Sequence, residues 1–184
     1  MLEFCATNDW IDLALECGAD KAAVIPVSAL VFSREFRAAC EQNSCGKYDA
    51  NWMCPPDAGN IDELIERAKS FQFIFVFQTI AKLEDSFDIE GMERAADEHN
   101  KILQRLRKKI IAQNSNLLCL GAGGCHVCAC CSKIDNEPCR YPDDAISSLE
   151  TYGIAVSEMA ATAGMRYING QNTVTYFGGF LYYI

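Results

Sequence analysis

Four cysteines in the second half of the chain have the spacing of ligands that surround one small metal centre. Cys125, Cys128 and Cys131 are each separated by two residues, and Cys139 follows after seven more. Three thiols at this spacing can wrap around a cubane of iron and sulfide, in which each ligand reaches a different corner. Bacterial ferredoxins use the same run with a fourth cysteine and a nearby proline, here Pro142. The pattern therefore predicts a 4Fe–4S cluster on these four cysteines.

Zinc is the alternative metal for this run. A zinc site with four thiolates usually takes two pairs of cysteines, with two residues inside each pair and a longer insert between the pairs. Here two such pairs would overlap, and Cys139 would stand alone. In ferredoxins with two clusters the fourth cysteine serves the other cluster, so the assignment of Cys139 stays open. The spacing favours iron–sulfur and keeps zinc as the second choice.

Two glycines and a histidine lie beside the first cysteine of the run. Gly123 and Gly124 directly precede Cys125, and glycines there let backbone N–H groups approach the sulfides of a cluster closely. Such hydrogen bonds stabilise the reduced, more negative cluster. His126 can donate a hydrogen bond to the ligands or carry a proton, and a role as an ordinary polar loop residue fits the sequence equally well. These three residues are candidates for cofactor binding.

Arg140 directly follows the last cysteine of the run. A cation at this position favours the thiolate and the reduced cluster. The alternative is an ion pair with one of the nearby aspartates, Asp143 or Asp144. Arg140 is therefore a further candidate for cofactor binding.

A second group of cysteines lies a third of the way along the chain. Cys40, Cys45 and Cys54 fall within one stretch that ends in two prolines. Their spacing is not diagnostic, and the plain alternative is three cysteines packed in a loop. The sharper interpretation is a second metal site with an open coordination position, unless a fourth thiol from the other loop closes it. Trp52 can shield a cluster from water, which shifts its reduction potential.

The remaining cysteines are isolated. The chain has 11 cysteines in 184 residues, and its start lacks the basic region and apolar run of a signal peptide. A chain of this length needs no disulfide scaffold, and an odd number of cysteines cannot all pair internally. We therefore expect a reduced, cytoplasmic protein. Packing or surface thiols are the interpretation for four residues, Cys5, Cys17, Cys119 and Cys130.

The charge balance argues against two kinds of partner. With 16 basic and 25 acidic residues, the formal net charge is −9. Binding to a nucleic-acid backbone needs clustered lysines and arginines. The one basic cluster, residues 101–109, ends a helix whose first half is acidic, as in a solvated face that complements the helix dipole. No stretch approaches the roughly 18 apolar residues of a membrane span. We expect neither nucleic acid nor a membrane as partner.

Hydrophobic periodicity predicts strands that alternate with helices. Asn60 followed by Glu63 is a helix cap signal, and His99 on the longest helical stripe is expected to be a hydrogen-bonded core residue. Helices are expected over residues 7–18, 32–40, 60–68, 88–113, 144–152 and 156–163, and strands over 22–27, 71–77, 117–120, 173–177 and 180–184. This order predicts one α/β or α+β domain over residues 1–184, with a sheet of about four strands covered by helices and two cysteine-rich loops.

The chain resembles the predicted metal-binding proteins of anaerobic bacteria and archaea, a family of uncharacterised function. The resemblance is carried by residues 33–40, 43–48, 51–56, 121–125 and 138–142, and it extends from about residue 22 to the end. It implies metal binding through seven cysteines, Cys40, Cys45, Cys54, Cys125, Cys128, Cys131 and Cys139. Cys130 is an addition to the family pattern, which leaves the choice between Cys130 and Cys131 open.

Three functions fit these observations. The leading hypothesis is an iron–sulfur protein with one or two 4Fe–4S clusters that transfers electrons to a partner protein, or supports a partner enzyme, in anaerobic metabolism. The second is an enzyme whose three-cysteine site keeps an open iron for sulfur-transfer or Lewis-acid chemistry. The third is a zinc-stabilised module that binds another protein.

Overall fold

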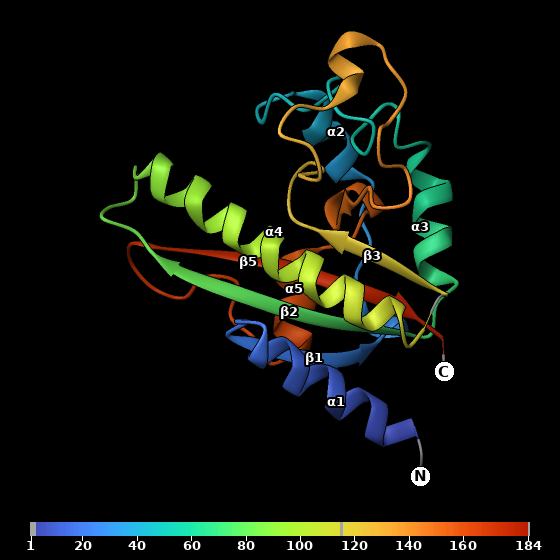
Figure 1. Cartoon of the computed structure of the whole chain (residues 1–184), viewed down its shortest axis with the longest axis vertical. Helices are drawn as coiled ribbons and strands as arrows, with labels where there is room; N and C mark the ends of the chain where they lie inside the picture. The colour runs from blue at the N-terminus through green and yellow to red at the C-terminus, as the bar shows by residue number, and fades with distance from the viewer. Residues whose placement is uncertain (1–2, 115, 184) are drawn as a thin grey trace.

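The fold is built on one five-stranded sheet with the strand order β1-β2-β5-β3-β4 (Figure 1). The computed structural model describes residues 3–114 and 116–183, with side chains from Asp9 onward. Neighbouring strands are antiparallel except β3 and β4, which are parallel. The strands are β1 (Lys21–Pro26), β2 (Phe73–Lys82), β3 (Leu117–Gly121), β4 (Ser147–Ser148) and β5 (Thr173–Tyr182). This sheet confirms the predicted fold class, with one strand more than expected.

Five α-helices connect or cover the strands. They are α1 (Glu3–Glu16), α2 (Glu35–Glu41), α3 (Ile61–Lys69), α4 (Ile89–Ile111) and α5 (Val156–Thr162). Asn60 caps α3 by accepting a hydrogen bond from Asp62 N, and Asp88 caps α4 by accepting one from Gly91 N at 2.8 Å. Short 3₁₀ helices are η1 (Val27–Ala29), η2 (Ser132–Asp135) and η3 (Glu150–Tyr152). None of the helices in the described ranges is long and apolar enough to cross a membrane.

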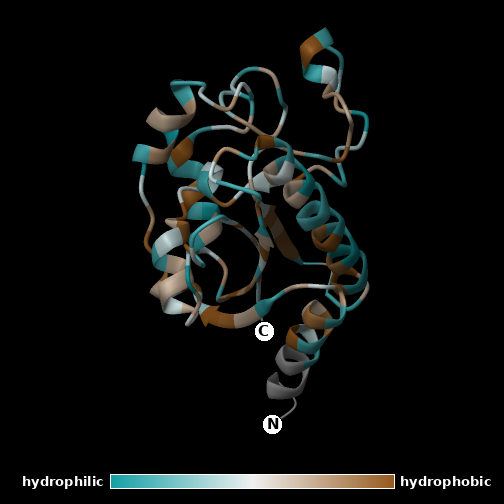
Figure 2. Ribbon diagram, turned by 90° about the vertical axis from the view of Figure 1, so that its left-hand side faces the viewer, coloured by the Kyte–Doolittle hydropathy of each residue, from teal (hydrophilic) through white to brown (hydrophobic). Residues whose placement is uncertain are grey.

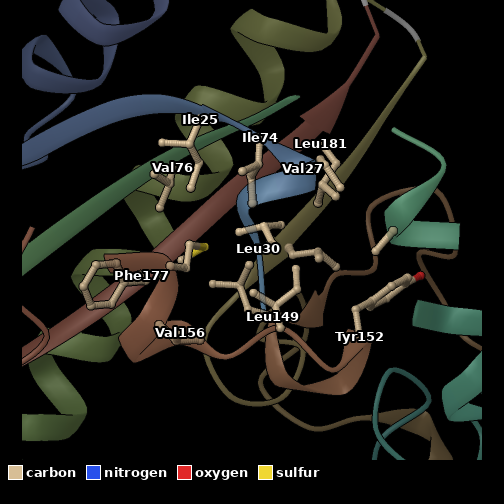
Figure 3. Packing of buried hydrophobic residues seen from close by; sticks show 14 of the residues in the cluster. Ile25, Val27, Leu30, Ile74, Val76, Leu149, Tyr152, Val156, Phe177 and Leu181 are labelled. Carbon is tan, nitrogen blue, oxygen red and sulfur yellow. The ribbon is translucent and has the colours of Figure 1, made fainter. Parts of the chain in front are cut away.

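Side chains alternate along β2 and separate two hydrophobic clusters. Ile74 and Val76 belong to the cluster that α3 and α5 cover (Figure 3). Phe75 and Phe77 belong to the cluster that α1 and α4 cover on the other face of the sheet. The period of two residues along a strand produces this separation. The sheet is therefore buried on both faces by regular elements.

Two parts of the fold differ from the sequence prediction. The helix expected over residues 144–152 is wrong, because this stretch forms β4 and η3. Leu149 N donates to the carbonyl of Gly121 at 3.0 Å, so pairing with the end of β3 replaces helical hydrogen bonds. The two strands expected near the C-terminus are one strand, β5, which continues through Gly178. A Cβ atom there would lie 2.6 Å from the Phe77 ring, so glycine makes room for a core aromatic. The expected strand end at residue 184 lies outside the described residues.

Candidate metal centre

Two cysteine-rich segments lie together at one end of the fold, beyond the end of β3 (Figure 1, Figure 2). The first cysteine segment, residues 40–59, follows α2 as a series of turns. The second cysteine segment, residues 121–142, leaves β3 and contains η2. Long-range contact therefore joins segments that are separated by 70 residues in the sequence, those between Cys54 and Cys125.

Side-chain hydrogen bonds connect the two segments. Asn51 Nδ2 donates to the carbonyl oxygen of Cys125 at 3.2 Å. Trp52 Nε1 donates to the carbonyl oxygen of Glu137 at 3.0 Å. Asn51 is only 3% exposed, so its hydrogen bond to Cys125 is shielded from water where the two segments meet.

Ion pairs add to this contact. Lys133 in η2 lies 3.2 Å from an Asp49 carboxylate oxygen and 2.9 Å from one of Asp57. Its ammonium also lies 4.6 Å from the centre of the Trp52 ring. Lys133 therefore anchors the second segment to the first, and its own side chain is mostly buried.

The four cysteines of the predicted cluster line one small pocket. This pocket is formed by the second segment and is closed from the first segment by Asn51, Trp52 and Met53. The cysteines among its lining residues are Cys125, Cys128, Cys131 and Cys139. Thiolates are the ligands that iron–sulfur clusters and zinc prefer, so the donor set fits either metal centre.

The structure separates Cys130 from its neighbour. Cys131 lines the pocket, whereas Cys130 is exposed and lies outside the lining. Among the described residues, no three His, Cys, Asp or Glu side chains stand close enough to hold a single metal ion. The site is therefore defined by the pocket that the four cysteines share, and Cys131 is the better third ligand.

The cysteines of the first segment lie near enough to influence one another's charge. Burial, then the nearby thiols of Cys45 and Cys40, raise the pKa of Cys54 to about 12. Burial and the Cys45 thiol also raise the pKa of Cys40. Cys125 is a further neighbour of Cys54, so the two groups of cysteines adjoin. The thiols of Cys40 and Cys54 are therefore protonated at neutral pH, and a metal must displace their protons to bind.

Gly124 lies where the two groups of cysteines meet. A Cβ atom on Gly124 would lie 3.3 Å from Asn51 Nδ2 and 3.5 Å from Cys54 Sγ. The first of these distances is tighter than usual side-chain packing, so a glycine allows the second segment to lie against the first. Gly123, with φ of +67°, makes the turn that precedes it.

A comparison with known protein families identifies the family of this chain. A family model described as "Predicted metal-binding protein (DUF2284)" matches residues 23–182. The chain belongs to this family of predicted metal-binding proteins. Both cysteine segments lie inside the matched range, and the resemblance inferred from the motifs is confirmed. No curated protein and no solved structure matches the chain.

Of the other residues predicted to serve a cofactor, only Trp52 is part of the pocket lining. Gly123, Gly124, His126 and Arg140 are not among the lining residues. His126 Nε2 lies 3.9 Å from the position of a Cβ atom on Gly123. Burial, and then the charge of Lys47, lower the pKa of His126, so the ring is neutral at pH 7. A neutral ring can donate one hydrogen bond and accept another.

Arg140 makes a different contact from the ion pair considered above. Its Nη1 donates to the carbonyl oxygen of Cys130 at 3.1 Å. The two aspartates contact Arg107 instead. Arg107 Nη1 lies 2.6 Å from Asp144 Oδ1, and Arg107 Nη2 donates to the backbone carbonyl of Asp143. Arg140 therefore fixes the backbone between two pocket cysteines.

Cysteines outside the two segments have the packing roles expected of them. Cys119 lies on β3 and packs against the hydrophobic cluster that α1 and α4 cover. Burial raises its pKa to about 12. Cys17 packs against the same cluster. The side chain of Cys5 lies outside the described side chains. His99 is the expected core histidine, because its Nδ1 lies 2.9 Å from Thr79 Oγ1 and its ring is 1% exposed.

Asn51 and Lys133 are the site residues that sequence reasoning missed. An asparagine in a turn-rich stretch and a lysine beside a cysteine carry no signal of their own. Their roles depend on contacts between segments that are distant in the sequence. Only the tertiary structure brings these partners together.

Proposed function

We propose that the chain is a cytosolic iron–sulfur protein that transfers electrons to a partner protein or gives redox support to a partner enzyme in anaerobic metabolism. A 4Fe–4S cluster is held by Cys125, Cys128, Cys131 and Cys139. The observation that carries this proposal is the pocket that these four cysteines share.

The surroundings of the pocket suit electron transfer. Trp52 and Met53 limit the access of water, and solvent exposure is one of the factors that set the potential of a cluster. Tyr141 lines the pocket and is 51% exposed. A partner protein can therefore approach the cluster at Tyr141.

The first segment supports a second site. The thiols of Cys45, Cys40 and Cys125 all raise the pKa of Cys54, and Cys125 already lines the pocket of the second segment. Three protein ligands leave a coordination position open. This favours, as a second candidate function, an enzyme that uses an open iron for sulfur-transfer or Lewis-acid chemistry.

Metal analysis of anaerobically purified protein tests the proposal. We expect about four iron and four sulfide per chain for one cluster, and about eight of each for two. Dithionite-reduced protein should give an electron paramagnetic resonance signal. Cys128→Ser should remove one cluster, whereas Cys130→Ser, the matched control, should retain the full iron content. Stoichiometric zinc without acid-labile sulfide would instead identify the zinc-stabilised interaction module and overturn the proposal.

A further inference from the structure

We infer that Tyr141 is the contact residue at which the pocket exchanges electrons with a positively charged redox protein. This inference rests on the proposed function, because it assumes a cluster on the four pocket cysteines. It deepens that proposal in two ways, since it centres the docking surface on one residue and gives the partner a charge.

Tyr141 is the exposed part of the pocket wall. Of the described residues that line the pocket, only Tyr141 is exposed, at 51%, and the others are buried or half-buried. Asn51 and Ser132 are the most deeply buried of them, at 3% and 1% exposed. A protein is far too large to enter a pocket of this kind, so it meets the pocket at the exposed wall. Tyr141 therefore marks the side from which a redox protein reaches the cluster.

Tertiary contacts close the side of the pocket that the first segment forms. Ser147 Oγ in β4 donates to the carbonyl of Met53 at 3.0 Å, which joins this wall to the sheet. Trp52 Nε1 donates to the carbonyl of Glu137 at 3.0 Å, which joins the same wall to the second segment. A partner that approached from the first segment would have to break these bonds, whereas docking at Tyr141 leaves the backbone in place.

The loop that carries Tyr141 is fixed on both sides of this residue. Before it, Ser132 Oγ donates to the carbonyl of Pro138 at 2.8 Å. After it, Asp144 N donates to the carbonyl of Tyr141 at 3.1 Å, and Arg107 Nη1 of α4 lies 2.6 Å from Asp144 Oδ1. A surface that is ordered before binding loses little conformational entropy in the complex. Tyrosine suits such a surface, because its ring is apolar and its hydroxyl is polar.

The same loop exposes more negative than positive charge. Asp135, Glu137 and Asp143 are exposed and take part in none of the ion pairs among the described residues. Arg140 is the opposing exposed cation, since Lys133 is paired with two carboxylates of the first segment. Together with the net charge of −9 of the whole chain, this balance favours a partner with lysines and arginines around its redox centre.

Electron transfer to cytochrome c, a basic haem protein used as the probe, tests the inference. The iron-loaded protein is reduced with dithionite, freed of the excess and mixed with ferric cytochrome c in a stopped-flow instrument. Each transfer moves one electron out of the pocket and reduces one ferric haem to ferrous haem, and no atom or proton is exchanged. The second-order rate constant should fall as the ionic strength rises, because opposite charges steer the encounter. Hexaammineruthenium(III), a small cation that needs no protein interface, is the control acceptor.

Variants at Tyr141 separate docking from effects on the cluster. Tyr141→Ala should lower the rate constant for cytochrome c by about five- to tenfold, as truncation of an interface tyrosine does, and should not lower that for hexaammineruthenium(III). Tyr141→Phe, which keeps the ring, should retain most of the rate with both acceptors. Tyr167→Ala is the matched control, because Tyr167 is 50% exposed but stacks on Phe177 of β5 and lies outside the pocket lining. It should leave both rates unchanged.

Photo-crosslinking locates the contact without a rate measurement. The photoreactive residue p-benzoylphenylalanine replaces Tyr141 in one variant and Tyr167 in another, so an aromatic side chain is exchanged for an aromatic one in both. Irradiation in the presence of cytochrome c should crosslink the first variant and not the second.

The failure of the inference differs from that of the proposed function. Full iron and sulfide content with equal rates in Tyr141→Ala and Tyr167→Ala, or with no excess of crosslinking at position 141, overturns the inference and leaves the iron–sulfur assignment standing. A fall in the rates for both acceptors together with a shifted reduction potential in Tyr141→Ala also overturns it, because Tyr141 then acts on the cluster and not on docking. A rate constant that rises with ionic strength contradicts the charge of the partner. Protein without iron and sulfide overturns both.

Discussion

The sheet and the cysteine-rich end of the molecule are held together in different ways. The sheet is buried on both faces, and residues such as Phe75 and Leu103 are fully or almost fully covered. The cysteine-rich end consists of turns, short helices and exposed residues around a small pocket. Its segments are joined by a few hydrogen bonds and ion pairs, among them those of Asn51 and Lys133. The sheet is thus held by its buried core, whereas the cysteine-rich end has few such contacts, and we predict that a bound metal adds to its rigidity.

Metal removal gives the sharpest test of this comparison. Removing the metal should loosen both cysteine segments and leave the sheet folded, because only the segments contain its ligands. Proteolytic cleavage within residues 40–59 and 121–142 should become roughly 100-fold faster, while far-ultraviolet circular dichroism changes little. Mass spectrometry of the fragments locates the cuts. Loss of the whole fold on metal removal would show that the sheet depends on the metal too.

The free energy of unfolding should depend on pH through His99, which lies in the buried core. Burial lowers the pKa of His99 to about 4, from about 6.5 in an unfolded chain. As the pH falls, the unfolded state takes up this proton first, so the stabilisation is complete above about pH 6.5 and is lost between pH 6.5 and 4. The loss amounts to about 3 kcal/mol in the free energy of unfolding.

Urea unfolding of the metal-free protein between pH 7 and pH 4 measures this loss. His99→Gln should flatten the pH dependence more than His126→Gln, because burial lowers the pKa of both rings and that of His99 falls to about 4. Nuclear magnetic resonance of the His99 ring reports its pKa directly. A ring that titrates near pH 6.5 in the folded protein would contradict the buried core role.

Asn51 links the two segments and tests how far they act as one unit. Asn51→Asp keeps an acceptor for Met53 N, which now bonds Asn51 Oδ1 at 3.0 Å, and removes the donor to the Cys125 carbonyl. We expect the free energy of opening of the segments to fall by about 2 kcal/mol. Hydrogen exchange of the amides in both segments measures this opening.

A control asparagine far from the pocket calibrates the effect of Asn51→Asp. Asn169→Asp removes the donors to the Arg166 carbonyl and to Thr175 Oγ1, both near β5. It should leave exchange in the cysteine segments unchanged. Equal effects of the two variants would mean that Asn51 has no special part in joining them.

The two regions also differ in how well the sequence predicts them. The stripe of α4 and the Asn60 cap of α3 were predictable because each depends on residues within or next to one helix. The spacing of the pocket cysteines was informative for the same reason, since ligands of one centre lie close in sequence. Such local patterns identify the ligands of a site before the fold is known.

What the sequence could not predict depends on distant partners. The strand β4 has two residues, and its existence rests on parallel pairing with β3. Asn51 and Lys133 owe their roles to partners in the other cysteine segment. The spacing already favoured Cys131 over Cys130, and the pocket agrees with that choice, because Cys131 lines it and Cys130 does not.

Trp52→Phe is the mildest change that tests the closure of the pocket. It keeps an aromatic ring against the pocket cysteines and removes only the hydrogen bond to the Glu137 carbonyl. We expect the opening free energy to fall by about 1 kcal/mol, with the reduction potential of the cluster unchanged. Trp52→Ala should also expose the pocket, so the potential shifts and the cluster is lost in air roughly tenfold faster. Voltammetry and the decay of visible absorbance measure these two effects. If Trp52→Phe shifts the potential as much as Trp52→Ala, the hydrogen bond governs the site, and the ring does not shield it.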